Sequence, residues 1–194
     1  MDHKNPLPSS DQEREKVARK KQEEVGWLDW LKVIGSAIVI AFFISTFIVS
    51  STVVEGRSMQ NTLHNGDRLF VMKLGSSLSD LKRGEIVVFH APDAKNMDYI
   101  KRIVALPGEY VQIENGLVYV NGKRLEENYI NTTYTHTGDQ KEWVVGEKQI
   151  FVLGDNRQKG ASKDSRVFGP IDASRIIGHA AFRYYPFTSM GGLQ

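Results

Sequence analysis

The feature that most constrains this chain is an apolar stretch over residues 33–54, which contains no charged residue. A helix rises about 1.5 Å per residue, so about 20 residues cross a hydrocarbon core of about 30 Å. Trp27 and Trp30 precede the stretch, and tryptophan favours the headgroup level of a bilayer. The sequence therefore predicts one membrane-spanning helix over residues 33–54.

Two other interpretations of this stretch fit its length less well. A buried core helix is usually shorter and shows a polar face, and a cleaved signal peptide has an apolar region of about 7–15 residues after a short basic segment. Here the apolar region is longer, and a polar tail, residues 1–32, precedes it. We therefore expect an uncleaved anchor in the lipid bilayer of the cell membrane.

The basic residues on the two sides of the stretch predict its orientation. Lysine and arginine are enriched on the cytoplasmic side within about 20 residues of a span, and acidic residues contribute little to this rule. The tail should therefore be cytoplasmic and residues 55–194 external. The basic residues before the stretch are Arg14, Lys16, Arg19, Lys20, Lys21 and Lys32, and those after it are Arg57, Arg68 and Lys73.

Residues 55–194 are expected to form one mostly β domain, a compact barrel or sandwich. Asn115-Gly116 and Asn121-Gly122 are typical of hairpin turns, because both residue types tolerate positive φ. No long amphipathic helix is evident, and many short strands joined by turns favour an all-β architecture. The segments rich in β-branched and aromatic residues are LFVMKL, EIVVFHA, YIKRIVAL, VQIENGLVYV, WVVGEKQIFVL and AFRYYPF.

Composition excludes several kinds of site. The chain has no cysteine, which rules out disulfides, thiolate nucleophiles and cysteine-based zinc sites. The net charge is only +2 and no basic run lies among aromatic residues, so we expect no nucleic-acid partner. We also expect no metal, because the histidines lack metal-ligand spacing; they are His3, His64, His90, His136 and His179.

Ser58 is the candidate nucleophile that its context singles out. It follows Gly56 closely and comes shortly after the apolar stretch. A glycine beside a serine lets the backbone approach a substrate and direct an N–H at a developing oxyanion. Taken alone, the pattern fits a serine in a turn equally well.

A serine nucleophile needs a base, and three residues are candidates. His64 and His90 could serve in principle. Lysine can replace histidine where burial makes it neutral, and Lys101 lies in the apolar segment 98–106. Alternation along a strand directs Lys101 to one face and Arg102 to the other. The alternative for Lys101 is a charge that protects an edge strand from aggregation.

A polar, glycine-rich segment, residues 154–166, is the third candidate region. It contains Asp155, Arg157, Asp164 and Arg166. Such a segment supports a site or forms a solvated loop with weak ion pairs, and its composition alone does not decide between them.

Four segments in a fixed order resemble the type I bacterial signal peptidases: GRSMQNTL, GDRLFVMK, YIKRIVALPGE and GDNR…SKDSR…GPI. The resemblance runs from about Trp27 to Ile177, and the single span is similar to the short forms of Gram-positive bacteria. It implies a membrane-bound serine endopeptidase that removes signal peptides from exported preproteins through a Ser–Lys dyad and an acyl-enzyme. It implies no cofactor, and it implies substrates with small residues at positions −1 and −3 of the cleavage site.

The resemblance also assigns roles to individual residues. It implies that Ser58 is the nucleophile, that its N–H contributes to the oxyanion hole, and that Lys101 is the general base. Ser162 would orient the lysine. The remaining matches are a structural ion pair of Arg102 and Asp155, two residues that brace the site, Asp164 and Arg166, and five that line pockets for small side chains, Val54, Met59, Leu63, Tyr99 and Ile100.

The chain departs from the family pattern in two places. Many relatives have a serine where Gly56 stands, so any second oxyanion donor here must be backbone or water. Two extra residues also precede Ser162. If they loop out within residues 158–161, the Ser162 hydroxyl should lie about 2.6–3.2 Å from the Lys101 nitrogen. If they are absorbed later, Ser165 becomes its neighbour.

Two other functions are compatible with parts of the pattern. A Ser–Lys peptidase with another target, such as the self-cleaving repressors that share a similar β core, would be cytosolic and would need no membrane span. An anchored β domain for binding alone would not bring Ser58 and Lys101 together. The distance between these two side chains therefore separates the hypotheses.

Overall fold

The computed structural model describes residues 26–73 and 78–193, so most of the polar tail, residues 1–25, lies outside the described residues. The chain divides into two units, residues 1–44 and residues 45–194, each considered by itself. In the first, α2 spans Trp27–Phe43 and is exposed along its length. A π-helical turn, η1, follows over Ile44–Ile48.

The helical segment, Trp27–Ile48, is long and apolar enough to cross a membrane, and it is the only such segment in the described part of the chain. It begins and ends earlier than the charge-free stretch of residues 33–54. The last part of that stretch forms a strand, β1, over Val49–Val53. The serine, threonine and valine content of this part explains the change, because β-branched residues lose side-chain freedom in a helix.

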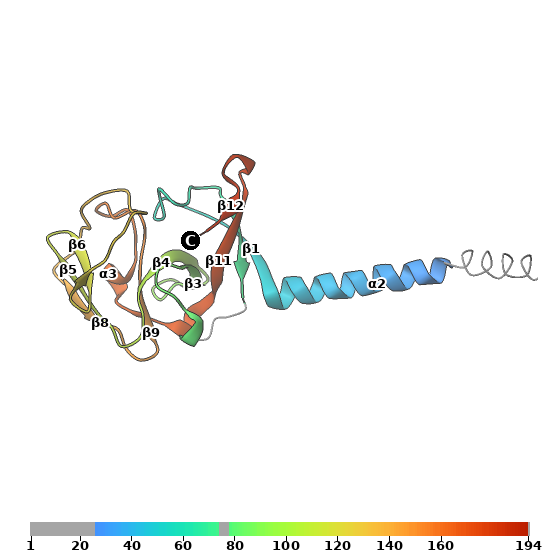
Figure 1. The fold of residues 1–194 in the computed structure, drawn as a ribbon, viewed down its shortest axis with the longest axis horizontal. Helices are drawn as coiled ribbons and strands as arrows, with labels where there is room; N and C mark the ends of the chain where they lie inside the picture. Colours follow the sequence, from blue (N-terminus) through green and yellow to red (C-terminus); the bar gives the residue numbers. More distant parts are fainter. Residues whose placement is uncertain (1–25, 74–77, 194) are drawn as a thin grey trace, which may run out of the picture. The chain divides into compact units, whose positions relative to one another are not determined.

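The second unit is built around a large antiparallel sheet of order β1-β2-β11-β3-β4-β9-β10, with β12 added beside β11 (Figure 1). The path begins at β1 and ends at β10, so the described sheet is open. The expected mostly β domain after one apolar helix is confirmed. After β1 the strand bounds are β2 Arg68–Met72, β3 Ile86–His90, β4 Asp98–Ala105, β9 Gln149–Leu153, β10 Ile171–Asp172, β11 Ile176–Tyr185 and β12 Gly191–Gly192.

A second, smaller sheet has the order β7-β6-β5-β8. Asn115 and Gly116, with φ of 51° and 77°, join β5 to β6, and Asn121 and Gly122, with φ of 50° and 75°, join β6 to β7. Both predicted hairpin turns are thus confirmed. The strand bounds are β5 Tyr110–Glu114, β6 Leu117–Val120, β7 Lys123–Arg124 and β8 Glu142–Val144.

Packed apolar side chains join the two sheets. Phe151 and Leu153 of β9 pack with Val111 of β5 and with Trp143 of β8, whose ring centroid lies 5.0 Å from that of Phe151. A second cluster lies around Phe89 and other residues of β3, β4 and β9. The helical segments of this unit are all short: η2 Leu78–Asp80, α3 Ser165–Phe168, η3 Ala173–Arg175 and η4 Phe187–Ser189.

Candidate active site

Ser58 lies in the connection between β1 and β2, and this connection is tied to itself by hydrogen bonds. The N–H of Gly56, a residue with φ of +88°, donates to Asn65 Oδ1 at 2.9 Å. The Val54 N–H donates to the Asp67 carbonyl at 2.8 Å. Positive φ is readily available only to glycine, which explains why Gly56 stands at this bend.

The Lys101 side chain meets Ser58 directly. Lys101 Nζ donates to Ser58 Oγ at 2.9 Å and to the Ile100 carbonyl at 2.8 Å. The two residues are 43 positions apart, so tertiary structure alone brings them together. Lys101 is only 4% exposed, although it stands on a strand whose first residue, Asp98, is exposed. A serine hydroxyl within hydrogen-bond distance of an amine can lose its proton to that amine once the amine is neutral.

Burial lowers the pKa of the Lys101 ammonium from 10.5 to about 8. Removal from water disfavours the charged form, and this is the largest effect. The charges of Asp164 and Asp155 raise this pKa and the charge of Arg166 lowers it. A substantial fraction of Lys101 is therefore neutral near physiological pH, as a general base must be.

Arg102, the residue after Lys101 in β4, is directed to the other face of the strand and makes a different set of contacts. It donates to both oxygens of Asp155, from Nε at 2.9 Å and from Nη2 at 2.8 Å, and both side chains are almost fully buried. Arg102 also donates to the Gly84 carbonyl, and its guanidinium lies 4.0 Å from the ring centroid of Tyr129. This pair ties β4 to the start of the loop that follows β9.

Asp164 and Arg166 form a second buried pair within that loop. Arg166 Nε and Nη2 donate to Asp164 at 2.8 and 2.7 Å, and the Gly154 N–H donates to the same carboxylate at 3.0 Å. Burial raises the pKa of the Asp164 carboxyl, but the hydrogen bonds and charge of Arg166 and the Gly154 N–H together lower it. Asp164 also caps α3 through the Arg166 N–H.

Ser162 and Ser165 take different positions. The Ser165 hydroxyl accepts a hydrogen bond from the Val152 N–H at 3.0 Å, so it is engaged with β9. Ser162 Oγ is buried beside Gly154 and the Ser58 carbonyl, since a Cβ built on Gly154 would lie 2.3 and 2.5 Å from these two oxygens. Ser162 Oγ makes no hydrogen bond of full geometry among the described residues, although it lies close enough to the Asp164 carboxylate to help lower the pKa of that group; the expected bond to Lys101 is absent.

Several further residues support the site, and of these only Arg157 was named individually from the sequence. Asn156 donates from its N–H to the Ser58 carbonyl at 3.0 Å and from Nδ2 to the Arg57 carbonyl at 3.1 Å. Thr62 donates to Asp155 Oδ2. Arg157 is fully buried and pairs with Glu127. Asn156 and Arg157 stand in the segment 154–166, which is the signal that pointed to them, whereas Thr62 and Glu127 carry no such signal.

A pocket of about 310 Å³ lies beside Ser58 and Lys101. Four of the five expected pocket residues, Val54, Met59, Tyr99 and Ile100, line it. Leu63 does not line it; it is fully buried and packs in the apolar cluster behind Val54 and Met59. The other lining residues are Thr52, Val53, Glu55, Val88, Asp98 and Lys163.

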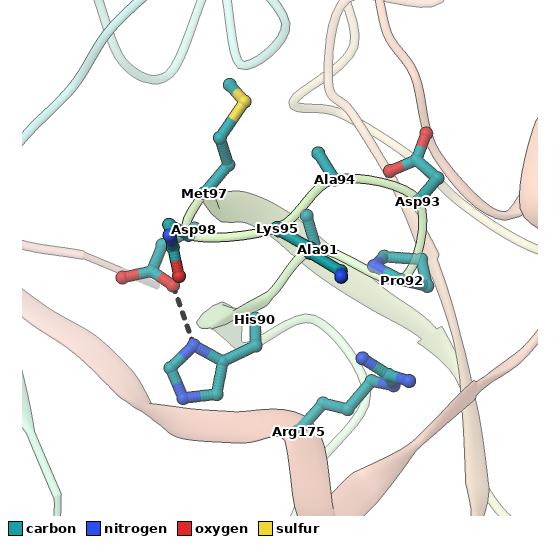
Figure 2. A pocket seen from close by; sticks show the side chains of 10 residues that line it. His90, Ala91, Pro92, Asp93, Ala94, Lys95, Met97, Asp98 and Arg175 are labelled. Carbon is teal, nitrogen blue, oxygen red and sulfur yellow. Dashed lines mark hydrogen bonds and ion pairs between the residues drawn. The ribbon is translucent and has the colours of Figure 1, made fainter.

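A larger hollow, of about 730 Å³, lies at the loop between β3 and β4 (Figure 2). His90 Nδ1 and Asp98 Oδ1 are 2.8 Å apart on its wall, and Arg175 also lines it. The hollow includes neither Ser58 nor Lys101. His90 is paired with Asp98 and is therefore not the partner of Ser58.

The described residues contain no group of three or more histidine, aspartate or glutamate side chains that could hold a metal ion. The polar groups around Ser58 are paired with one another: Arg102 with Asp155, and Arg166 with Asp164. What the site offers chemically is a hydroxyl, an amine of lowered pKa, and backbone donors.

Comparison with known proteins assigns this arrangement. Residues 27–185 match the family model described as signal peptidase, peptidase S26. The chain belongs to the signal peptidase family. The chain is 40% identical over 177 residues to signal peptidase IB of Staphylococcus aureus, covering 83% of this chain and 91% of that protein. It is 39% identical over 185 residues to signal peptidase I of Bacillus licheniformis, covering 91% and 96%.

One solved structure is also similar to this signal peptidase. It is a crystal structure of a signal peptidase I from Enterococcus faecalis V583, 31% identical, with a TM-score of 0.45. It covers 52% of this chain and 97% of the other.

In this signal peptidase, Gly154 permits the close approach of the 154–166 loop to Ser58. We predict that Gly154→Ala lowers peptidase turnover by about 100-fold, because misplacing reacting groups by about 1 Å has effects of that size. The Cβ would meet the Ser58 carbonyl, a backbone atom that cannot rotate away. Gly138→Ala is the matched control, since nothing lies within 4 Å of its Cβ position. Steady-state kinetics of both variants check this, and full turnover by Gly154→Ala would contradict it.

Proposed function

We propose that this chain is a signal peptidase I, a membrane-anchored serine endopeptidase that removes signal peptides from secreted preproteins through Ser58 and Lys101. The observation that supports the two residues best is the 2.9 Å contact between Lys101 Nζ and Ser58 Oγ. Family membership supplies the reaction, and the lowered pKa of Lys101 makes the residue competent as its base.

The first half of the reaction acylates the enzyme. Neutral Lys101 takes the proton of the Ser58 hydroxyl while Ser58 Oγ attacks the scissile carbonyl carbon. The tetrahedral oxyanion accepts a hydrogen bond from the Ser58 N–H, which has no acceptor among the described residues. The carbon–nitrogen bond then breaks as Lys101 returns its proton to the leaving amine, which is the new N-terminus of the mature protein.

The second half releases the signal peptide. Lys101, neutral again, takes a proton from a water molecule as that water attacks the ester carbonyl of the acyl-enzyme. The ester bond breaks, Ser58 recovers its proton from Lys101, and the signal peptide leaves with a free carboxylate. Gly56 cannot give the second oxyanion donor through its N–H, because that group already donates to Asn65.

The pocket beside Ser58 is proposed to receive the small side chains at positions −1 and −3. It has a volume of about 310 Å³, and Val54, Met59 and Ile100 give it apolar walls. Among the described residues, β9 pairs with β4 only from Arg102 onward, so the edge of Asp98–Lys101 remains open on that side. An extended peptide can add to such an edge by main-chain hydrogen bonds.

We also propose that the apolar helix anchors the enzyme in the bilayer, with the polar tail before it cytoplasmic and residues 55–194 outside. Support for the orientation comes from the excess of lysine and arginine before the helix. Anchoring confines enzyme and substrate to one surface, because the substrate's own apolar segment lies in the bilayer. Confinement raises their effective concentration.

The two alternatives fit the protein less well. A β domain that only binds partners has no need of a buried lysine beside a serine hydroxyl. A self-cleaving repressor-type peptidase needs no apolar helix long enough to cross a membrane, and this chain has one.

The first prediction concerns the dyad itself. Ser58→Ala and Lys101→Arg should each reduce preprotein cleavage by at least about 1,000-fold, because removal of a nucleophile or base leaves only residual catalysis. Arginine stays charged and cannot act as a base. Circular dichroism should show that both variants remain folded. A folded Lys101→Arg enzyme with near-normal turnover would disprove the mechanism.

The second prediction concerns pH. Lys101 acts when neutral and its pKa is lowered to about 8, so the rate should rise as pH increases and level off above that value. Below this pKa, each fall of one pH unit should reduce the rate by about tenfold, because the neutral fraction of Lys101 falls tenfold. The measurement is kcat against pH for a peptide substrate without groups that titrate between pH 6 and 9. A rate that falls from pH 6 to pH 8 would contradict a lysine base.

The third prediction concerns orientation. Protease added to intact spheroplasts should digest the domain of residues 55–194, since that domain is proposed to be external. A cytoplasmic marker protein should remain intact in the same sample. Protection of the domain until lysis would reverse the proposed orientation.

A further inference from the structure

One residue, Asn156, holds the backbone on both sides of Ser58. Its N–H donates to the Ser58 carbonyl at 3.0 Å, and its side-chain Nδ2 donates to the Arg57 carbonyl at 3.1 Å. These carbonyls belong to the two peptide units that flank the Ser58 α-carbon. Fixing both units restricts φ and ψ of Ser58, and therefore the direction of its side chain and of its N–H.

The bond to the Arg57 carbonyl has a direct consequence for the Ser58 N–H. The peptide between Arg57 and Ser58 is trans, so its C=O and N–H point in opposite directions. When Asn156 Nδ2 holds the carbonyl on one side, the Ser58 N–H is directed to the other side. That N–H is the proposed oxyanion donor, and it is free of protein acceptors among the described residues.

Two donors set which end of the Asn156 amide faces Arg57: the Gln158 N–H, which donates to Asn156 Oδ1 at 3.3 Å, and the side chain of a second asparagine. Asn131 Nδ2 donates to Asn156 Oδ1 at 2.8 Å, and Asn131 Oδ1 accepts from the Arg157 N–H at 3.1 Å. A backbone N–H can only donate, so it fixes the orientation of the Asn131 amide. The Asn131 amide in turn presents a donor to Asn156 Oδ1 and leaves Asn156 Nδ2 for the Arg57 carbonyl.

We propose that Asn131 and Asn156 form an amide relay that positions the oxyanion-stabilising N–H of Ser58. The relay runs from the Arg157 N–H through Asn131 and Asn156 to the Arg57 carbonyl. Both are positioning residues, because neither touches the reacting atoms. The proposal rests on the proposed function, since it assigns the Ser58 N–H to the oxyanion.

The relay should act on the transition state more than on substrate binding. The oxyanion forms only after attack, so a misdirected N–H weakens a bond that the ground state lacks. Loss of a whole oxyanion donor lowers kcat by about 100- to 1,000-fold. A donor that is present but misdirected should lower kcat by about 10- to 100-fold, with KM nearly unchanged.

Asn156→Asp tests the last step of the relay. The change preserves size and the backbone N–H, but it replaces the donor to the Arg57 carbonyl by an acceptor oxygen. We expect kcat on its high-pH plateau, where Lys101 is neutral, to fall by about 10- to 100-fold and KM to change by less than about threefold. The new carboxylate can raise the pH midpoint through its charge, so plateau values are compared. The affinity of a substrate-like peptide aldehyde, which forms a tetrahedral adduct on serine, should fall in parallel with kcat/KM.

Asn131→Asp tests the relay at a distance. The new carboxylate still accepts from the Arg157 N–H, but it can no longer donate to Asn156 Oδ1. The carboxylate repels Asn156 Oδ1 and favours a turn of the Asn156 amide, while the Gln158 N–H still holds that oxygen and opposes the turn. We therefore expect a fall in kcat that is smaller than that of Asn156→Asp, although Asn131 touches neither Arg57 nor Ser58. The double variant should be little worse than Asn156→Asp alone, because both changes act on the same chain of hydrogen bonds.

Asn128→Asp is the matched control, because it makes the same chemical change at an exposed asparagine of the same segment. It should leave kcat, KM and aldehyde affinity unchanged. Thermal unfolding of every variant in detergent shows which ones are folded, and kinetics are compared among folded variants. If the Asn156→Asp variant does not fold, the kinetics of the Asn131→Asp variant decide whether the relay exists.

Three results would overturn the relay. The first is wild-type kcat in a folded Asn156→Asp or Asn131→Asp enzyme. The second is a loss of rate that disappears on the high-pH plateau, which would mean that the changes act only through the charge of Lys101. The third is an equal loss of affinity for the uncleaved substrate in a Ser58→Ala background. If the proposed function itself were wrong, the Ser58→Ala enzyme would still cleave the substrate, and this outcome differs from all three results above.

Discussion

The burial of one amine is the constraint on which the rest of the site depends. Lysine is almost always charged in water, and here removal from water lowers the pKa of Lys101 to about 8. Keeping this amine buried requires a strand that enters the core beside it and a loop that covers it. β4 supplies the strand, and charged residues of the 154–166 loop lie close enough to influence the amine. The carboxylates nearby would oppose the effect, and pairing Asp164 with Arg166 reduces their influence on the amine.

The loop after β9 also connects the otherwise separate parts of the site. Asp155 pairs with Arg102 of β4, Asn156 holds the backbone around Ser58, and Asp164 holds Gly154. Ser58 and Lys101 come from different segments, so their 2.9 Å contact requires both segments to be tied to a common support. The buried ion pairs stabilise the loop and also fix the orientation of their side chains, because a guanidinium bonded to both carboxylate oxygens permits little rotation.

Much of this could be predicted from the sequence, and the rest could not for physical reasons. The turns at Asn115-Gly116 and Asn121-Gly122 depend on local backbone preferences, and the short strands depend on alternating side chains, so both are visible in a linear pattern. Ser58 and Lys101 were found through motifs. The contacts of Asn131, Thr62 and Glu127 depend on tertiary folding of segments far apart, and no local pattern records them. Ser162 was named from the sequence, but its expected hydrogen bond to Lys101 is absent, because the place of its hydroxyl beside Gly154 and the Ser58 carbonyl depends on tertiary packing.

The central claim is that burial lowers the pKa of Lys101 enough to make the amine neutral in an appreciable minority of molecules near physiological pH. Its most direct test is a ¹³C NMR titration of the lysine Cε resonances in the full-length protein in detergent, with Lys101→Arg used to assign the Lys101 signal. The account predicts a titration midpoint for Lys101 near pH 8, well below the 10.5 of an ordinary lysine. A midpoint at or above 10.5 would contradict it, because the amine would then be charged whenever the enzyme works.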